Sequence, residues 1–332
     1  MTGQKTALVL GATGGIGGAL SRRLVAAGWQ VKAPHRNAAA QSARAGIAWV
    51  QGDAMRREDV AAAAAGVSLI VHAVNPPGYR DWETLVLPML DNTIAAARAS
   101  GARIVLPGTV YNFGPDAFPV LTEDSPQHPV TKKGAIRAEM ERRLREASKG
   151  GVRTLIVRAG DFFGPAAGNN WFSQGLVKPG KPLRSITYPG RRGTTHQWAY
   201  LPDMAETILR LVEREGELPA FAVFHMKGHL DADGSEMIAA IRRVVGKPDL
   251  PVRSFPWWLL PLAAPFVTLF REMKEMRYLW REPHRMDNAR LVAFLGAEPH
   301  TPLDEAVRTT LAGLGCLDKG QRSEPRPVHS IG

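Results

Sequence analysis

Three glycines near the amino terminus, Gly11, Gly14 and Gly17, are the residues whose spacing most directly suggests chemistry. They follow the apolar run Thr6–Leu10 and precede the helix-like segment Ala19–Val25. In a strand–turn–helix unit of this kind, the backbone can approach a diphosphate, and the first amides of the helix bind its negative charge. The sequence therefore predicts a dinucleotide-binding turn made of Gly11, Thr13, Gly14, Gly15, Ile16 and Gly17. The alternative is an ordinary glycine-rich turn between a strand and a helix.

The end of the second predicted strand indicates which dinucleotide binds. An acidic residue there would bond the ribose 2′-hydroxyl of NAD and repel a 2′-phosphate. The segment Lys32–Asn37 has no acidic residue, and Arg36 can make a charge-assisted contact with a phosphate. We therefore predict NADP(H) as the cofactor, with NAD less favoured. The alternative is that Arg36 is a solvated loop residue.

The elements that must position these residues alternate between strands and helices through the first half of the chain. Predicted strands cover Thr6–Leu10, Gln30–Pro34, Ile47–Gln51, Leu69–Val74, Arg103–Pro107 and Thr154–Arg158. Predicted helices cover Arg57–Ala65, Trp82–Ser100 and Lys133–Lys149. This alternation predicts an α/β fold, a Rossmann-type doubly wound parallel sheet with helices on both faces. The ligand crevice should then lie at the carboxyl ends of the strands.

A change in amino-acid composition after Gly164-Pro165 predicts a second, smaller lobe. Prolines and glycines become dense, and shorter elements follow, including a helix at Ser235–Val245. We expect residues 1–165 to form mainly the NADP-binding domain and residues 166–317 mainly a C-terminal substrate lobe. Within the lobe, about 198–215 should return to the first domain, and the polar tail 318–332 should be disordered.

Composition narrows the possible partners. The chain has 332 residues and a net charge of +11, which favours anionic ligands such as a phosphate-bearing cofactor. Its basic residues are mixed with acids, so we expect no nucleic-acid partner. The single cysteine, Cys316, and the absence of a signal-peptide layout predict a cytoplasmic protein. The apolar segment 255–270 is too short and too rich in proline to span a bilayer; we expect a core element, a substrate lid or a lipid-contacting surface.

Several further motifs together resemble the extended or atypical short-chain dehydrogenase/reductase superfamily, which includes NAD-dependent epimerases and dehydratases. They include Gly52-Asp53, Val71–Asn75, Val157–Pro165, Trp198–Ala205 and a C-terminal pattern at Asp287–Arg290, Leu295-Gly296 and Pro302-Leu303. The resemblance spans about residues 5–315. It implies that Asp53 holds the adenine, that Ala73 and Asn75 line one wall of the cofactor site, and that Gly160 lies beside the nicotinamide. It also implies a possible homodimer.

The chain departs from that superfamily at its usual catalytic Tyr-x-x-x-Lys pair. Lys133 stands where the Tyr is expected and Arg137 where the Lys is expected. Burial or the neighbouring charge of Arg137 would make Lys133 a better proton donor, whereas Arg137 could bind ribose hydroxyls but stays protonated. Thr109 and Tyr111 follow the fifth strand and are further catalytic candidates, although Pro107 falls at the usual Ser position. Structural roles for Lys133 and Tyr111 are the alternative.

Aromatic and polar residues around the expected crevice are candidates for substrate contact. They are Tyr79 and Trp82 after the fourth strand, Trp171 after the nicotinamide-side segment, and His196. A lone loop histidine such as His196 is more often structural. No spacing in the sequence matches a metal-binding motif, so no metal is expected.

These features favour an NADP(H)-dependent oxidoreductase that acts on a small or moderately apolar carbonyl or alcohol. A nucleotide-sugar epimerase or dehydratase is the enzymatic alternative, but in the family those reactions depend on the Tyr of the Tyr-x-x-x-Lys pair, which this chain lacks. A non-catalytic NADP(H)-sensing regulatory protein is the alternative from another class, and the altered catalytic pair favours it.

Overall fold

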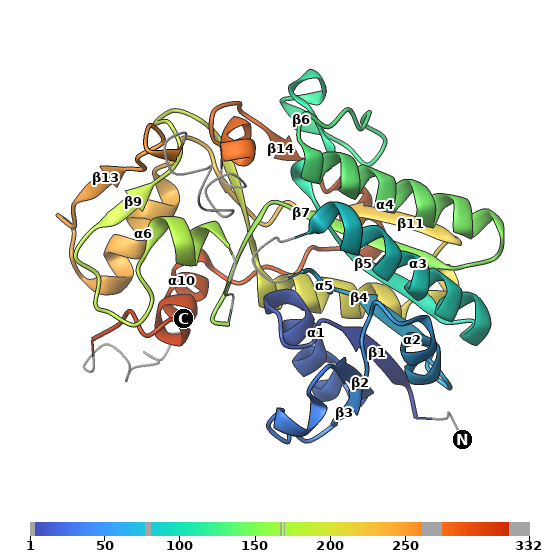
Figure 1. Ribbon diagram of the computed structural model, residues 1–332. Helices are drawn as coiled ribbons and strands as arrows, with labels where there is room; N and C mark the ends of the chain where they lie inside the picture. The colour runs from blue at the N-terminus through green and yellow to red at the C-terminus, as the bar shows by residue number, and fades with distance from the viewer. Residues whose placement is uncertain (1–3, 77–80, 167, 169, 261–273, 319–332) are drawn as a thin grey trace, which may run out of the picture.

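A seven-stranded parallel sheet forms the centre of the molecule (Figure 1). The computed structural model describes residues 4–76, 81–166, 168, 170–260 and 274–318. In spatial order the strands are β11 (Phe221–His225), β7 (Thr154–Ala159), β5 (Arg103–Thr109), β4 (Leu69–His72), β1 (Thr6–Leu10), β2 (Gln30–His35) and β3 (Ile47–Gln51). Every neighbouring pair is parallel. The predicted doubly wound fold is confirmed.

Helices cover both faces of this sheet because its buried strands alternate their side chains between two cores. Ala7 and Val9 of β1 pack with α1 (Gly15–Ala26) and α5 (Leu201–Glu213). Leu8 and Leu10 point to the other face. That face is covered by α2 (Arg57–Ala63), α3 (Trp82–Ser100) and α4 (Lys132–Lys149).

The strand order reverses between β1 and β4. From β1 the chain proceeds outward through β2 to β3, and from β4 it proceeds the other way through β5 to β7. Connections diverge at such a point, so a crevice opens beyond the carboxyl ends of the two central strands. The glycine turn leaves β1 at this crevice, and His72 ends β4 beside it.

The carboxyl-terminal part of the chain builds a smaller lobe beside the sheet (Figure 1). Its small sheets consist of β8 (Asp161–Phe163), β10 (His196–Tyr200) and β12 (His229–Asp231), and of β9 (Ile186–Tyr188) with β13 (Val252–Ser254). A further pair joins β14 (Arg285–Met286) to β6 (Val120–Leu121), which comes from the first half of the chain. Its helices include α6 (Glu236–Val245) and α10 (Leu303–Gly313), while α9 (Ala289–Leu295) packs on β11 through Phe294 and Phe224. The lobe has its own aromatic core.

The structure differs from the sequence expectations mainly at element ends. The strand at β4 stops at His72 rather than Val74, α2 stops at Ala63, and β5 continues to Thr109. β11 was not anticipated at all. Within the described residues, no helix is long and apolar enough to cross a membrane. Most of the apolar segment 255–270 and all but the first residue of the predicted tail lie outside the described residues.

Candidate functional site

A cavity of about 950 Å³ opens at the carboxyl ends of the central strands. Among the residues chosen from the sequence, it is lined by Gly11, Thr13, Gly14, Gly15, Ile16, Arg36, Asp53, Ala73, Asn75, Trp82, Thr109, Tyr111, Lys133, Arg137, Gly160 and Trp171. Gly17 and His196 do not line it, and Tyr79 lies outside the described residues. The chain thus brings candidates from widely separated segments to one space.

The glycine turn has the form that a diphosphate requires. Gly11 has a φ of +87°, and a Cβ there would lie 2.5 Å from the carbonyl oxygen of Ala73. A Cβ on Gly17 would lie 2.2 Å from the carbonyl oxygen of Gly11, so Gly17 lets α1 pack against the turn. Gly14 caps α1 without a side-chain hydrogen bond, and no acidic residue occupies the first turn. The first amides of α1 therefore face the cavity without a competing carboxylate, and the turn fits a dinucleotide.

The residues expected around the adenosine ribose lie on the opposite rim. Arg36, just beyond β2, is exposed and lines the cavity. In the part of the chain that the structure describes, no acidic side chain forms an ion pair with it. Asp53 Oδ1 accepts a hydrogen bond from the Met55 amide at 3.0 Å, which holds its carboxylate at the same rim. The rim therefore has a cation available for a phosphate.

Helix α4 brings Lys133 and Arg137 into the cavity from one face, because residues four apart lie above one another on a helix. Thr131 caps the helix by accepting a hydrogen bond from the Gly134 amide at 3.0 Å. Lys133 is only 5 % exposed, and its Nζ lies 5.9 Å from the centre of the Trp82 ring. The Arg137 guanidinium lies 5.2 Å from the same ring and donates to Asn75 Oδ1 at 3.2 Å. Two basic side chains thus lie against one aromatic ring at the inner end of the cavity.

Thr109 and Tyr111 form the neighbouring wall at the end of β5. Thr109 Oγ1 accepts a hydrogen bond from the Tyr111 amide at 2.8 Å, so the hydroxyl caps the short helical turn that follows. A Cβ on Gly134 would lie 2.3 Å from the Tyr111 carbonyl oxygen, so Gly134 allows α4 to approach this turn. Pro107 also lines the cavity, and it has no side-chain hydroxyl to offer.

The far wall comes from the smaller lobe and contains a residue that the sequence reasoning did not single out. Asp161 lines the cavity, and its Oδ2 lies 3.0 Å from His196 Nε2. His196 was expected to touch substrate, but it lies behind Asp161, 3 % exposed and stacked on Trp280 at 3.7 Å between ring centres. Pairing of Trp198 with Asp161 in the β10–β8 register fixes this placement, and such register is not visible in a local pattern.

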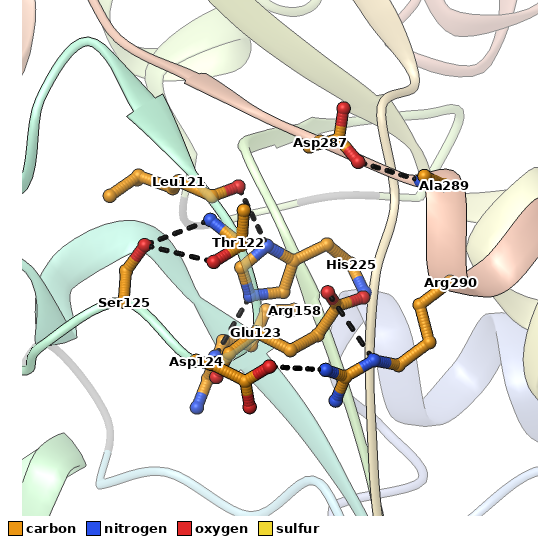
Figure 2. A network of polar contacts seen from close by, with 10 residues as sticks. All are labelled: Leu121, Thr122, Glu123, Asp124, Ser125, Arg158, His225, Asp287, Ala289 and Arg290. Atoms are coloured by element: carbon orange, nitrogen blue, oxygen red, sulfur yellow. Dashed lines mark hydrogen bonds and ion pairs between the residues drawn. The ribbon is translucent and has the colours of Figure 1, made fainter.

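A buried polar network behind β7 contacts α4, and Figure 2 shows the part of it formed by Arg158, His225 and Arg290. The fully buried Arg158 donates to Glu141 of α4 through Nε at 2.9 Å and Nη2 at 2.5 Å. Arg158 Nη1 lies 2.8 Å from His225 Nε2, and Arg290 pairs with Glu123 and Asp124 at the edge of the network. Burial, reinforced by the charge of Arg158, lowers the pKa of His225 to about 3, so its neutral ring accepts the Arg158 hydrogen bond at pH 7. Glu141 lies two helical steps of four residues beyond Lys133, so this anchor also fixes the catalytic candidates.

His72 adds a second buried imidazole at the inner end of the cavity. Its Nδ1 lies 2.8 Å from Thr93 Oγ1 of α3. Burial and the nearby charge of Arg137 lower the pKa of His72 to about 3, so it is neutral near pH 7. His72 is therefore not one of the charged groups at this end of the cavity.

The sheet, the glycine turn and the cavity together define a Rossmann-type protein of the extended short-chain dehydrogenase/reductase superfamily. The chain belongs to the NAD dependent epimerase/dehydratase family, whose model matches residues 7–224. None of the curated proteins matches the chain.

Several solved structures share the fold over nearly the whole chain. A protein from Burkholderia cenocepacia J2315, provisionally named an epimerase, has 19% identity and a TM-score of 0.73, covering 94% of this chain and 98% of its own. UDP-glucose 4-epimerase from Thermotoga maritima has 14% identity and a TM-score of 0.72, with 93% and 98% covered. UDP-glucuronic acid 4-epimerase from Bacillus cereus, solved with NAD, has 15% identity, a TM-score of 0.72 and the same coverage.

Proposed function

We propose that this protein is an NADP(H)-dependent oxidoreductase that acts on an uncharged, largely apolar carbonyl compound or the corresponding alcohol. One observation carries the proposal: a single cavity joins the glycine turn and Arg36 at one end to Lys133 and an aromatic wall at the other. When bound, the nicotinamide cofactor supplies or accepts a hydride. A second molecule in the same cavity would lie beside a group able to exchange a proton.

The chain's own groups divide the work of binding and proton transfer. Amides at the start of α1 bind the diphosphate, and Arg36 contacts the 2′-phosphate. Arg137, held by Asn75, donates hydrogen bonds to ribose hydroxyls. Lys133 exchanges the proton with the substrate oxygen, in the position that the family usually gives to a tyrosine. Trp82 packs against both cations and shields them from water.

The far wall favours an uncharged substrate. Among its described residues Trp171, Phe162, Leu201 and Met276 are apolar, and the one charged side chain is Asp161. A nucleotide sugar would bring two more phosphates to this wall, where a carboxylate repels them and no described cation offsets the repulsion. The structural neighbours solved with UDP-glucose or UDP-glucuronic acid therefore support the fold and the dinucleotide site of this proposal, and not their own substrates.

The test combines binding with turnover. Tag-free protein is titrated with NADPH and NADH by fluorescence, and NADPH oxidation is then followed over a panel of aldehydes and ketones, with UDP-glucose and UDP-galactose as separate arms. We expect tighter NADPH binding and turnover of at least one apolar carbonyl compound. Interconversion of the UDP-sugars would replace the proposal with the epimerase alternative. Saturable NADPH binding without any turnover would favour a sensor.

A further inference from the structure

Away from the dinucleotide cavity, one carboxylate and two imidazoles converge from three separate segments. Asp203 lies in the first turn of α5, His229 begins β12, and His300 precedes α10. One ring nitrogen of each histidine and one carboxylate oxygen of Asp203 lie within 4.8 Å of one another. Asp203 and His229 are buried, whereas His300 is exposed. None of the three lines the cavity described above.

The inner part of this cluster leaves a polar atom without a partner. His229 is 7 % exposed, and its Nε2 is buried with no hydrogen-bond partner. An imidazole nitrogen in that state costs free energy unless a donor, an acceptor or a cation reaches it. The ring centre of His300 lies only 4.4 Å from that of His229, so a second potential ligand stands close to the unpartnered group.

The carboxylate is already oriented as a metal ligand would be. Asp203 accepts hydrogen bonds from the Thr301 amide at 2.8 Å and from Thr301 Oγ1 at 2.6 Å. Outer hydrogen bonds of this kind fix the direction of ligating carboxylates and leave further lone pairs for a cation. Because Thr301 follows His300 directly, the same two bonds also hold His300 beside the carboxylate.

We propose that Asp203, His229 and His300 bind a divalent transition-metal ion, with Zn²⁺ as the expected occupant. Two imidazoles and a carboxylate form a donor set that suits Zn²⁺, whereas Mg²⁺ and Ca²⁺ prefer oxygen donors alone. Water completes the coordination on the exposed side of His300. The ion would tie the segment before α10 to α5 and β12.

The spacing of the three donor groups allows this site to form. A tetrahedral zinc site has metal–ligand distances of about 2.0–2.2 Å, which place its donor atoms about 3.4 Å from one another. The three donor atoms here lie within 4.8 Å of one another, so they must move closer when the ion binds. The exposed His300 side chain can rotate to bring its ring nitrogen closer to the other two donor atoms.

Metal titration of the full-length, tag-free chain tests the site without any activity assay. Protein treated with EDTA and dialysed is titrated with ZnCl₂ by calorimetry, and with CoCl₂ while the visible absorption of bound cobalt is recorded. We expect one equivalent of either ion to bind to the wild type and Zn²⁺ to raise the Tm. An absence of saturable Zn²⁺ binding would overturn the proposal.

Two variants and a control assign the binding to these residues. His300→Ala removes an exposed ligand that the fold does not need, so we expect Zn²⁺ affinity to fall at least ~tenfold and the cobalt spectrum to be lost. Thr301→Val removes one outer hydrogen bond from Asp203 and should weaken Zn²⁺ binding by roughly tenfold. His128→Ala is the matched control, because His128 is an exposed histidine paired with a carboxylate, Asp116, at 2.7 Å. Equal Zn²⁺ binding by His300→Ala and wild type, or equal losses in His300→Ala and His128→Ala, would contradict the assignment.

Discussion

Lys132 and Lys133 are adjacent in sequence but differ completely in environment. The Lys132 side chain is 75% exposed and pairs with Glu83 at 2.8 Å, whereas Lys133 is buried in the cavity against Trp82. We expect Lys133→Met to lower kcat by about 10²–10⁴-fold on whichever carbonyl compound turns over, because general acid–base groups contribute on that scale. NADPH affinity should stay near that of the wild type.

The neighbouring residue provides the control for that prediction. Lys132→Met removes the same charge one position earlier, and steady-state kinetics should show kcat unchanged. A similar loss in both variants would mean that the effect arises from the charge of the helix start. In that case Lys133 would have no special part in proton transfer.

Arg36 should decide the choice between the two nicotinamide cofactors. A charge-assisted hydrogen bond contributes about 1.5–3 kcal/mol, so Arg36→Ala should raise the Kd for NADPH roughly 10–100-fold and leave the Kd for NADH almost unchanged. Fluorescence titration of both cofactors measures this. Arg57→Ala, at the exposed start of α2, is a control for the general loss of positive charge. Equal weakening of both cofactors by Arg36→Ala would argue against a 2′-phosphate contact.

At the scale of elements, the contact between α4 and β7 includes one buried ion pair besides apolar packing. Arg158 and Glu141 have side chains that are 0% and 6% exposed. Glu141→Gln leaves the guanidinium charge buried without its counter-ion, so we expect the free energy of unfolding to fall by about 3–5 kcal/mol. Glu139→Gln on the same helix breaks only surface contacts with Arg142 and Arg143 and should cost about 0–1 kcal/mol. Urea unfolding compares the two variants, and equal costs would show that the buried pair is not the anchor.

The elements that were predictable from sequence are those whose signals are local. The signals of the glycine turn and of the apolar runs of β1 to β5 and β7 come from neighbouring residues, so their placement needs no knowledge of the fold. β11 was missed because Phe221–His225 closely follows Pro219 and becomes a strand only by pairing with β7. The pairing of Asp161 with His196 and the approach of His229 to His300 are likewise products of tertiary structure, and no spacing in the sequence encodes them.

At the scale of the whole molecule, buried histidines should make the fold sensitive to acid. Burial lowers the pKa of His72 and His225 to about 3 and that of His284 to about 4. In the unfolded chain these groups take up protons near pH 6.5, whereas the folded protein excludes those protons until much lower pH. Stability is therefore fully present above pH 6.5 and falls as the pH decreases toward 4, by about 2 kcal/mol for each histidine at pH 5.

Urea unfolding at pH 7.5 and pH 5.0 measures this dependence. The His284→Asn variant loses one of the three groups, so the difference between its two unfolding free energies should be smaller than in the wild type. A wild-type stability that rises on acidification, or an identical difference in the variant, would contradict the prediction.

The outermost position of β11 has a consequence for how the molecule is made. β11 completes the sheet beside β7, yet the chain reaches it only after forming β8, β10 and α5. When only the residues up to β7 have left the ribosome, the outer edge of that strand has no hydrogen-bonding neighbour. At that stage α5 is also missing, so it cannot pack against α1. Such a nascent intermediate exposes a template for unwanted strand pairing. The outer edge of β7 is therefore covered only after residue 225 has left the exit tunnel.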